Sequence, residues 1–277
     1  MQYIAITFQI PEVSEEKINI LIALLDSLSY EGITEEDSEV IAYIPEDEFD
    51  RSLLEVTLAG MKSTLHAKIV HEEVIEEKNW NQEWEENFDP VIIDNRCVIR
   101  APFHEKFKGF EYVINIEPKM SFGTGHHETT SLMISALLDM DIKKKTVLDM
   151  GCGTGVLAIL SAMKEAKEVI GIDIDKWAVD NAIENALLNK VEVSFLKGST
   201  NVIPDIPFDL ILANINRNIL IEQASEYIMH LDSCGKILLS GFLEGDVEMI
   251  ESTYVDLGMT PVNHRTLGKW QMLEFVK

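Results

Sequence analysis

The sequence has few cysteines and no long apolar run. Its three cysteines, Cys97, Cys152 and Cys234, lie far apart and form no CxxC pair. This spacing excludes a disulfide framework and is typical of a reducing cytoplasm. No stretch approaches the roughly 18 uninterrupted apolar residues of a membrane helix. The first residues, MQYIAITFQIPE, lack a basic region before their apolar run, so they do not resemble a signal peptide. We therefore expect a cytoplasmic protein that does not contact membranes.

Lysine and arginine are also scarce, with 23 of them against 48 Asp and Glu, and the net charge is -25. Residues 1–89 hold 22 acidic and 5 basic side chains, so most of the excess lies there. Direct binding to a nucleic-acid backbone is disfavoured, because phosphate contacts need basic side chains. Two interpretations of the acidic N-terminal part stay open: it keeps the protein soluble, or it attracts a basic partner.

Residues 1–77 predict a small α+β domain. Strands are expected at 3–10, 38–44 and 66–76, with helices from Ser14 and at 46–60. The second helix makes four apolar residues available for a core: Phe49, Leu53, Leu54 and Val56. The order βα(β)βαβ is that of a ferredoxin-like unit. Residues 78–90 (KNWNQEWEENFDP) predict a connecting helix that ends at Pro90. Its aromatic residues share one helical face, which either docks onto a domain or grips a partner; they are Trp80, Trp84 and Phe88.

Residues 91–277 alternate strand and helix patterns. The expected strands are 146–150, 168–173, 208–215 and 236–242, and the expected helices are 127–139, 155–165, 176–189 and 217–231. Such alternation predicts an α/β doubly wound parallel sheet. After a helix at 245–257, residues 259–277 predict an antiparallel hairpin that turns at Leu267–Gly268 and lies at the sheet edge.

A glycine loop, VLDMGCGTGVLAI (147–159), joins an expected strand to an expected helix. Glycines let the backbone turn sharply and approach a ligand, and the following helix N-terminus offers free N–H groups. Asp173 ends the next strand, where its carboxylate can accept hydrogen bonds from a ribose diol. A dinucleotide site would need a third glycine where Val156 stands, so this loop argues against NAD.

The Asp149, Gly151, Gly153, Gly155 pattern (DxGxGxG) resembles motif I of class I S-adenosylmethionine-dependent methyltransferases. In that family the loop passes under the methionine part of the cofactor, and the strand order ends with an antiparallel hairpin. The strand FDLILANI ends at Asn214 without the Pro-Pro-aromatic sequence of release-factor glutamine and many DNA-amine methyltransferases.

The upstream segment SFGTGHHETT is similar to the FGTGxHxTT segment of the ribosomal protein L-eleven (L11) methyltransferases. FGTG (122–125), His127 and Thr129–Thr130 match, and His126 and Glu128 stand where the family usually has Thr and Pro. A small ferredoxin-like domain, a linker and a methyltransferase domain also resemble that family. The implied domains are residues 1–77 for substrate recognition, 78–90 as the linker and 91–277 for methyl transfer.

The resemblance implies a monomeric enzyme that methylates lysine side-chain and N-terminal amines of the basic ribosomal protein L11. Phe122, Gly123, Thr124 and Gly125 would form a mobile flap. Asn214 would be the catalytic residue, its side-chain carbonyl accepting a hydrogen bond from the amine. The residues expected to contact S-adenosylmethionine are Thr130, Gly151, Gly153, Gly155, Asp173, Asn214 and the flap.

Other functions stay open. The chain could be a class I methyltransferase for another protein or a small molecule, or a noncatalytic S-adenosylmethionine-binding assembly factor. No metal site is expected, because the HHE sequence at 126–128 has no third ligand at useful spacing and HExxH is absent.

Overall fold

A computed structural model describes residues 2–11, 14–36, 39–61, 65–75, 88–119 and 121–277. The chain divides into two compact units, Met1–Asn87 and Phe88–Lys277, called unit 1 and unit 2 below. The expected connecting helix at 78–90 falls mainly on residues 76–87, so this part of it, with Trp80 and Trp84, lies outside the described residues. In the described part of the chain, no helix combines the length and the apolarity needed to cross a membrane.

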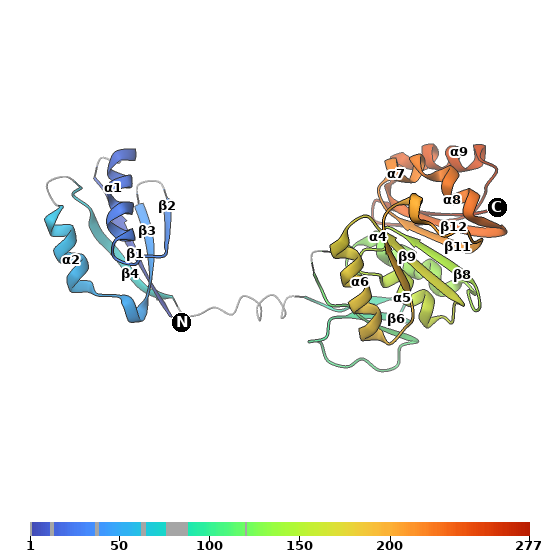
Figure 1. The fold of residues 1–277 in the computed structure, drawn as a ribbon, viewed down its shortest axis with the longest axis horizontal. Helices are drawn as coiled ribbons and strands as arrows, with labels where there is room; N and C mark the ends of the chain where they lie inside the picture. Colours follow the sequence, from blue (N-terminus) through green and yellow to red (C-terminus); the bar gives the residue numbers. More distant parts are fainter. Residues whose placement is uncertain (1, 12–13, 37–38, 62–64, 76–87, 120) are drawn as a thin grey trace. The chain divides into compact units, whose positions relative to one another are not determined.

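Unit 1 is a four-stranded antiparallel sheet packed against two helices (Figure 1). Its elements are β1 (Tyr3–Gln9), α1 (Glu15–Asp26), β2 (Gly32–Glu36), β3 (Glu39–Pro45), α2 (Arg51–Gly60) and β4 (Lys68–Ile75). The strands are arranged β2-β3-β1-β4, which is the ferredoxin-like order. Phe8 on β1, Leu25 on α1 and Leu54 on α2 are among the buried residues that join sheet and helices.

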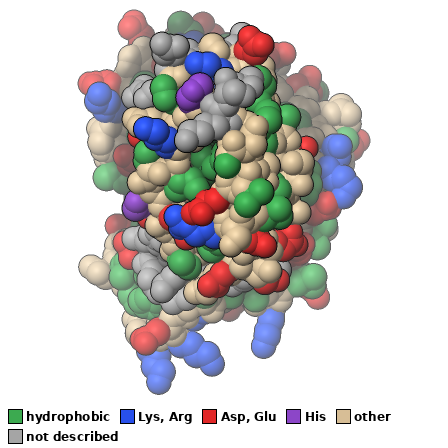
Figure 2. All heavy atoms as spheres, turned by 90° about the vertical axis from the view of Figure 1, so that its left-hand side faces the viewer, with side chains coloured by type: hydrophobic (Ala, Val, Ile, Leu, Met, Phe, Trp, Pro, Cys, Tyr) green, Lys and Arg blue, Asp and Glu red, His purple; other side chains and the backbone are tan. Residues whose placement is uncertain are grey.

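The second helix of unit 1 begins later than the sequence predicted. Glu46–Glu48 form a 3₁₀ turn, and α2 begins after Asp50, whose carboxylate accepts a hydrogen bond from the Leu53 N–H at 3.0 Å. Of the apolar positions expected in the core, Leu54 is buried, but Leu53 and Val56 are 51% and 71% exposed. The sequence offered both for a core, and for these two residues that expectation is wrong. Figure 2 shows hydrophobic side chains between Asp and Glu side chains on one face of the molecule.

Unit 2 opens with a three-stranded sheet that the sequence pattern did not predict. β5 (Val91–Ile93) pairs antiparallel with β6 (Cys97–Arg100), and β6 pairs parallel with β7 (Tyr112–Asn115). Four of its side chains belong to the core on one face of the main sheet: Ile93, Cys97, Ile99 and Ile114. These strands are only three or four residues long, so they leave little periodicity to detect.

The main sheet of unit 2 has seven strands in the order β10-β9-β8-β11-β12-β14-β13. β8 to β12 run parallel, and β14 runs antiparallel to both of its neighbours, which confirms the doubly wound sheet and the hairpin. The strands are β8 (Thr146–Met150), β9 (Glu168–Asp173), β10 (Ser194–Lys197), β11 (Phe208–Asn214), β12 (Leu231–Leu243), β13 (Thr260–Leu267) and β14 (Trp270–Val276).

Helices cover both faces of this sheet (Figure 1). They are α4 (Glu128–Asp139), α5 (Val156–Met163), α6 (Lys176–Asn189), α7 (Arg217–Glu222), α8 (Ala224–His230) and α9 (Val247–Asp256). Leu137, Leu157 and Ala186 place α4, α5 and α6 on one face, and Leu220 and Tyr254 place α7 and α9 on the other. Two continuous apolar cores therefore hold the parallel strands from both sides.

Two details of unit 2 differ from the sequence expectation. The helix expected at 217–231 is interrupted at Gln223, which ends α7 and precedes α8. The sequence pattern did not predict the edge strand β10, because its four residues, SFLK, are too few to show a period. Both differences lie beside the cavity described next.

Candidate active site

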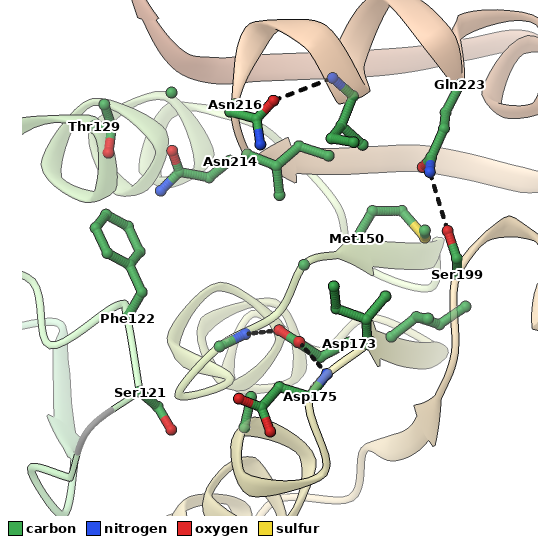
Figure 3. A pocket seen from close by; sticks show the side chains of 18 of the residues that line it. Ser121, Phe122, Thr129, Met150, Asp173, Asp175, Ser199, Asn214, Asn216 and Gln223 are labelled. Carbon is green, nitrogen blue, oxygen red and sulfur yellow. Dashed lines mark hydrogen bonds between the residues drawn. The ribbon is translucent and has the colours of Figure 1, made fainter.

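A cavity of about 620 Å³ opens at the carboxyl ends of the parallel strands of unit 2 (Figure 3). Met150 ends β8, Asp173 ends β9 and Asn214 ends β11, and all three line the cavity. Gly241 of β12 lines it as well. In open α/β sheets the carboxyl ends of the strands are the usual place for ligands, because connecting loops diverge there.

The glycine loop forms the floor of the cavity and requires its glycines. Gly151, Gly153 and Gly155 have φ of 69°, 54° and 78°, in the left-handed region that other residues avoid. A Cβ on Gly153 would lie 2.2 Å from the carbonyl oxygen of Phe122. The loop is therefore tightly packed, and Gly155 leads directly into the N-terminus of α5.

Asp173 presents an oriented carboxylate to the cavity. Its Oδ2 accepts from the Gly153 N–H, and its Oδ1 accepts from the Asp175 N–H, each at 2.9 Å (Figure 3). Each oxygen still has acceptor capacity, because a carboxylate oxygen can take two donors. Such an arrangement is suited to two neighbouring hydroxyl groups, as in a ribose.

Asp149, the acid at the head of the loop, lies behind the cavity. It is buried and accepts a hydrogen bond from the Ala158 N–H at 3.1 Å. Burial raises the pKa of Asp149 to about 7, although this hydrogen bond opposes the shift. The residue therefore connects the strand end to the first turn of α5.

The flap, defined as residues 122–125, lies against the glycine loop. The Thr154 N–H donates to the Phe122 carbonyl at 2.9 Å, and the Thr154 hydroxyl donates to the Gly123 carbonyl at 2.7 Å. Phe122 is 54% exposed and lines the cavity. Gly123 and Gly125 have φ of 105° and 95°, so the flap backbone depends on glycine at both positions.

Asn214 brings an unsatisfied acceptor to the cavity. Its amide nitrogen donates to the Thr130 hydroxyl at 3.4 Å, while its Oδ1 is buried and has no hydrogen-bond partner among the described residues. Its side chain points toward Phe122 across the cavity, with Thr129 beside them (Figure 3). A buried acceptor without a partner is costly, so Oδ1 marks a place where a ligand N–H would be stabilised.

An aromatic wall that the sequence did not reveal completes the cavity. The His127 ring lies 4.6 Å from the Trp270 ring and 5.2 Å from the Phe122 ring, measured between ring centroids. Trp270 belongs to β14, far along the chain, and both it and His127 line the cavity. The sequence indicates His127 only as a position that matches the family segment, and no sequence pattern indicates Trp270.

The structure brings together part of the predicted set. Phe122, Gly151, Gly153, Asp173 and Asn214 line the cavity. Among the described residues, the other predicted ones are not part of the cavity lining: Thr130, Gly155, Gly123, Thr124 and Gly125. Polar lining residues that were not predicted are Ser121, Thr129, Asp175, Ser199, Asn216, Gln223 and Tyr227.

The residues present fit S-adenosylmethionine. Asp173 can hold a ribose, the glycine loop lets a ligand approach the backbone, and Asn214 offers an unpartnered acceptor. This site and the strand order define a class I S-adenosylmethionine-dependent methyltransferase. Residues 6–277 match the model of the family described as ribosomal protein L11 methyltransferase (PrmA). The chain belongs to this family.

Relatives of this chain span its whole length. It is 40% identical over 281 residues to the ribosomal protein L11 methyltransferase of Bacteroides thetaiotaomicron, covering 99% of each chain. It is 33% identical to that of Chlorobaculum parvum, covering 94% of this chain and 92% of the relative. A crystal structure of ribosomal protein L11 methylase from Lactobacillus delbrueckii subsp. bulgaricus superposes with a TM-score of 0.64 at 28% identity, covering 68% of this chain and 98% of that one.

Proposed function

We propose that this enzyme transfers methyl groups from S-adenosylmethionine to lysine side-chain and N-terminal amines of ribosomal protein L11. The names of its full-length relatives support this substrate. The observation that carries the chemistry is the buried, unpartnered Oδ1 of Asn214 at the cavity. An amine nitrogen that donates one N–H to this oxygen would direct its lone pair into the cavity.

The chemical demand on the protein is alignment. S-adenosylmethionine supplies an electrophilic methyl group, and the protein must hold an amine in line with it. A lysine amine has a pKa of about 10.4 and must lose a proton to attack. The apolar wall of Phe122 and Trp270 favours the neutral amine, because burial lowers the pKa of an amine. With S-adenosylmethionine held by Asp173 and the glycine loop, the amine nitrogen would gain the methyl group as the C–S bond breaks, and its surplus proton would leave to water.

Asn214→Ala tests this role. We expect kcat to fall by roughly two orders of magnitude, the range that one positioned hydrogen-bonding group contributes to a transition state. Binding of S-adenosylhomocysteine should change less, because Asp173 and the glycine loop are intact. Asn218→Ala is the matched control, since Asn218 is an exposed asparagine on α7 that does not line the cavity. Near-normal turnover by Asn214→Ala would remove the residue from the mechanism.

The substrate is tested with tritiated S-adenosylmethionine and unmodified ribosomal proteins plus ribosomal RNA, separated after incubation. We expect label in protein L11 alone and none in RNA, which agrees with the acidic charge of the chain. Label in another protein or in RNA would keep the methyltransferase and change its substrate. Absence of all label would favour the noncatalytic assembly factor, provided that S-adenosylhomocysteine still raises Tm and NAD does not.

We also propose that the enzyme acts as a monomer and that unit 1 captures the protein substrate. Residues 1–89 carry a net charge of -17, which suits a basic ribosomal protein. Light scattering of the enzyme alone at micromolar concentration measures its mass, and the mass of a dimer would contradict the proposed monomer.

A further inference from the structure

His126, the residue after the flap, holds the chain where it enters unit 2. Its Nε2 lies 2.8 Å from the Asp89 carbonyl oxygen, and its Nδ1 lies 3.1 Å from the Thr124 hydroxyl. Because a carbonyl can only accept, Nε2 must carry the proton. In the neutral ring Nδ1 therefore accepts from the Thr124 hydroxyl. One imidazole thus joins the flap to the first residues of unit 2.

The neighbouring residue Phe88 is held by the same ring and by a second histidine. The Phe88 ring meets the His126 ring edge to face, with centroids 4.5 Å apart. The Phe88 carbonyl accepts from His104 Nε2, and His104 Nδ1 accepts from the Ala101 N–H at 3.0 Å. Two histidines therefore bind the carbonyls of consecutive residues, and only His126 also contacts the flap.

The other end of the flap contacts the floor of the cavity. Thr154, in the glycine loop, donates to both the Phe122 and the Gly123 carbonyls. A displacement of Asp89 must either break its bond to His126 or move that ring together with Thr124. Gly123 and Gly125 flank Thr124 on both sides. Because glycine tolerates large backbone changes, the flap backbone can follow such a movement.

We propose that His126 is a positioning residue that couples the segment entering unit 2 to the flap. Capture of the protein substrate by unit 1 then stabilises the closed flap over the cofactor. This inference rests on the proposed function for the part played by unit 1. The coupling between flap and segment is a property of unit 2 and can be tested without any protein substrate. The coupling depends on one neutral hydrogen bond, so we expect changes of about two- to tenfold in dissociation rate and in amide protection.

The first test measures backbone amide exchange with S-adenosylhomocysteine alone, in the full-length enzyme. In the wild type, the ligand should slow exchange at 123–126 and also at Phe88 and Asp89, which do not line the cavity. In His126→Ala the protection at Phe88 and Asp89 should disappear. His230→Ala is the matched control, because the His230 ring bonds the Glu226 carbonyl in its own helix, at 2.9 Å. Equal protection at Phe88 and Asp89 in wild type and His126→Ala would overturn the coupling.

The second test measures dissociation of S-adenosylhomocysteine with and without unmethylated L11. We expect L11 to slow dissociation of S-adenosylhomocysteine two- to tenfold in the wild type and in His230→Ala. In His126→Ala, L11 should leave this dissociation rate unchanged. A wild type that methylates L11 without any change in this rate would refute the coupling to substrate capture and keep the proposed function. A wild type that does not methylate L11 would refute the proposed function, and the amide exchange would still decide the role of His126.

Discussion

Gly153→Ala tests the close packing between the glycine loop and the flap directly, because the added methyl group would meet the flap backbone. The new methyl group would lie 2.2 Å from the Phe122 carbonyl oxygen, which must retreat by about 1 Å to reach ordinary contact. The left-handed backbone, with φ of 54°, costs a non-glycine residue roughly 1–2 kcal/mol. Loss of the hydrogen bond from the Thr154 N–H to Phe122 costs about 0.5–1.5 kcal/mol more.

Together these terms predict a loss of about 1.5–3.5 kcal/mol, which corresponds to a Tm decrease of roughly 3–14 °C for a domain of this size. The affinity for S-adenosylhomocysteine should fall about tenfold or more, because the Gly153 N–H also orients Asp173. Calorimetry of unfolding and of binding gives both quantities. Gly245→Ala is the control, since its Cβ would meet nothing within 4 Å. A Gly153→Ala enzyme that melts and binds like this control would refute the close packing of flap and loop.

Three further predictions concern thiols, acid stability and salt. A thiol reagent should modify exposed Cys234 in the native enzyme, and should reach buried Cys97 and Cys152 only on unfolding, because burial raises both of their thiol pKa values. Hydrogen bonding from Arg265 lowers the pKa of Asp139. Its stabilisation is therefore present above the unfolded pKa and lost as pH falls through the folded one. The urea midpoints of wild type and Asp139→Asn should differ at pH 7, and the difference should shrink as pH falls below the unfolded value of about 3.9. The Michaelis constant for L11 should rise with salt, whereas a salt-independent value would argue against electrostatic capture.

The long parallel strands and the glycine loop were predictable because they rely on local signals. Apolar runs such as TVLDM are buried on both faces of a sheet, and the positive φ values of the loop require glycine. The position of Asp173 followed from the loop and the next strand. The position of Asn214 at the cavity was predictable because it ends a strand that leads to the same edge of the sheet.

The remaining features depend on contacts between distant segments. Trp270 reaches the cavity only because β14 lies beside β12, and no local pattern records that pairing. The sequence offered Leu53 and Val56 for a core, but burial depends on what covers a helix face, and the structure leaves both exposed. The tautomer of His126 follows from a carbonyl 37 residues earlier in the chain.

The position of β14 has a consequence for how the enzyme is made. β14 fills the gap between β12 and β13, although it follows both of them in the chain. On a translating ribosome, β12 therefore keeps an unpaired edge until residues 270–276 have left the exit tunnel. An open strand edge beside a finished parallel core can pair with other nascent chains. The same late strand delivers Trp270, so the aromatic wall of the cavity forms only when that edge closes.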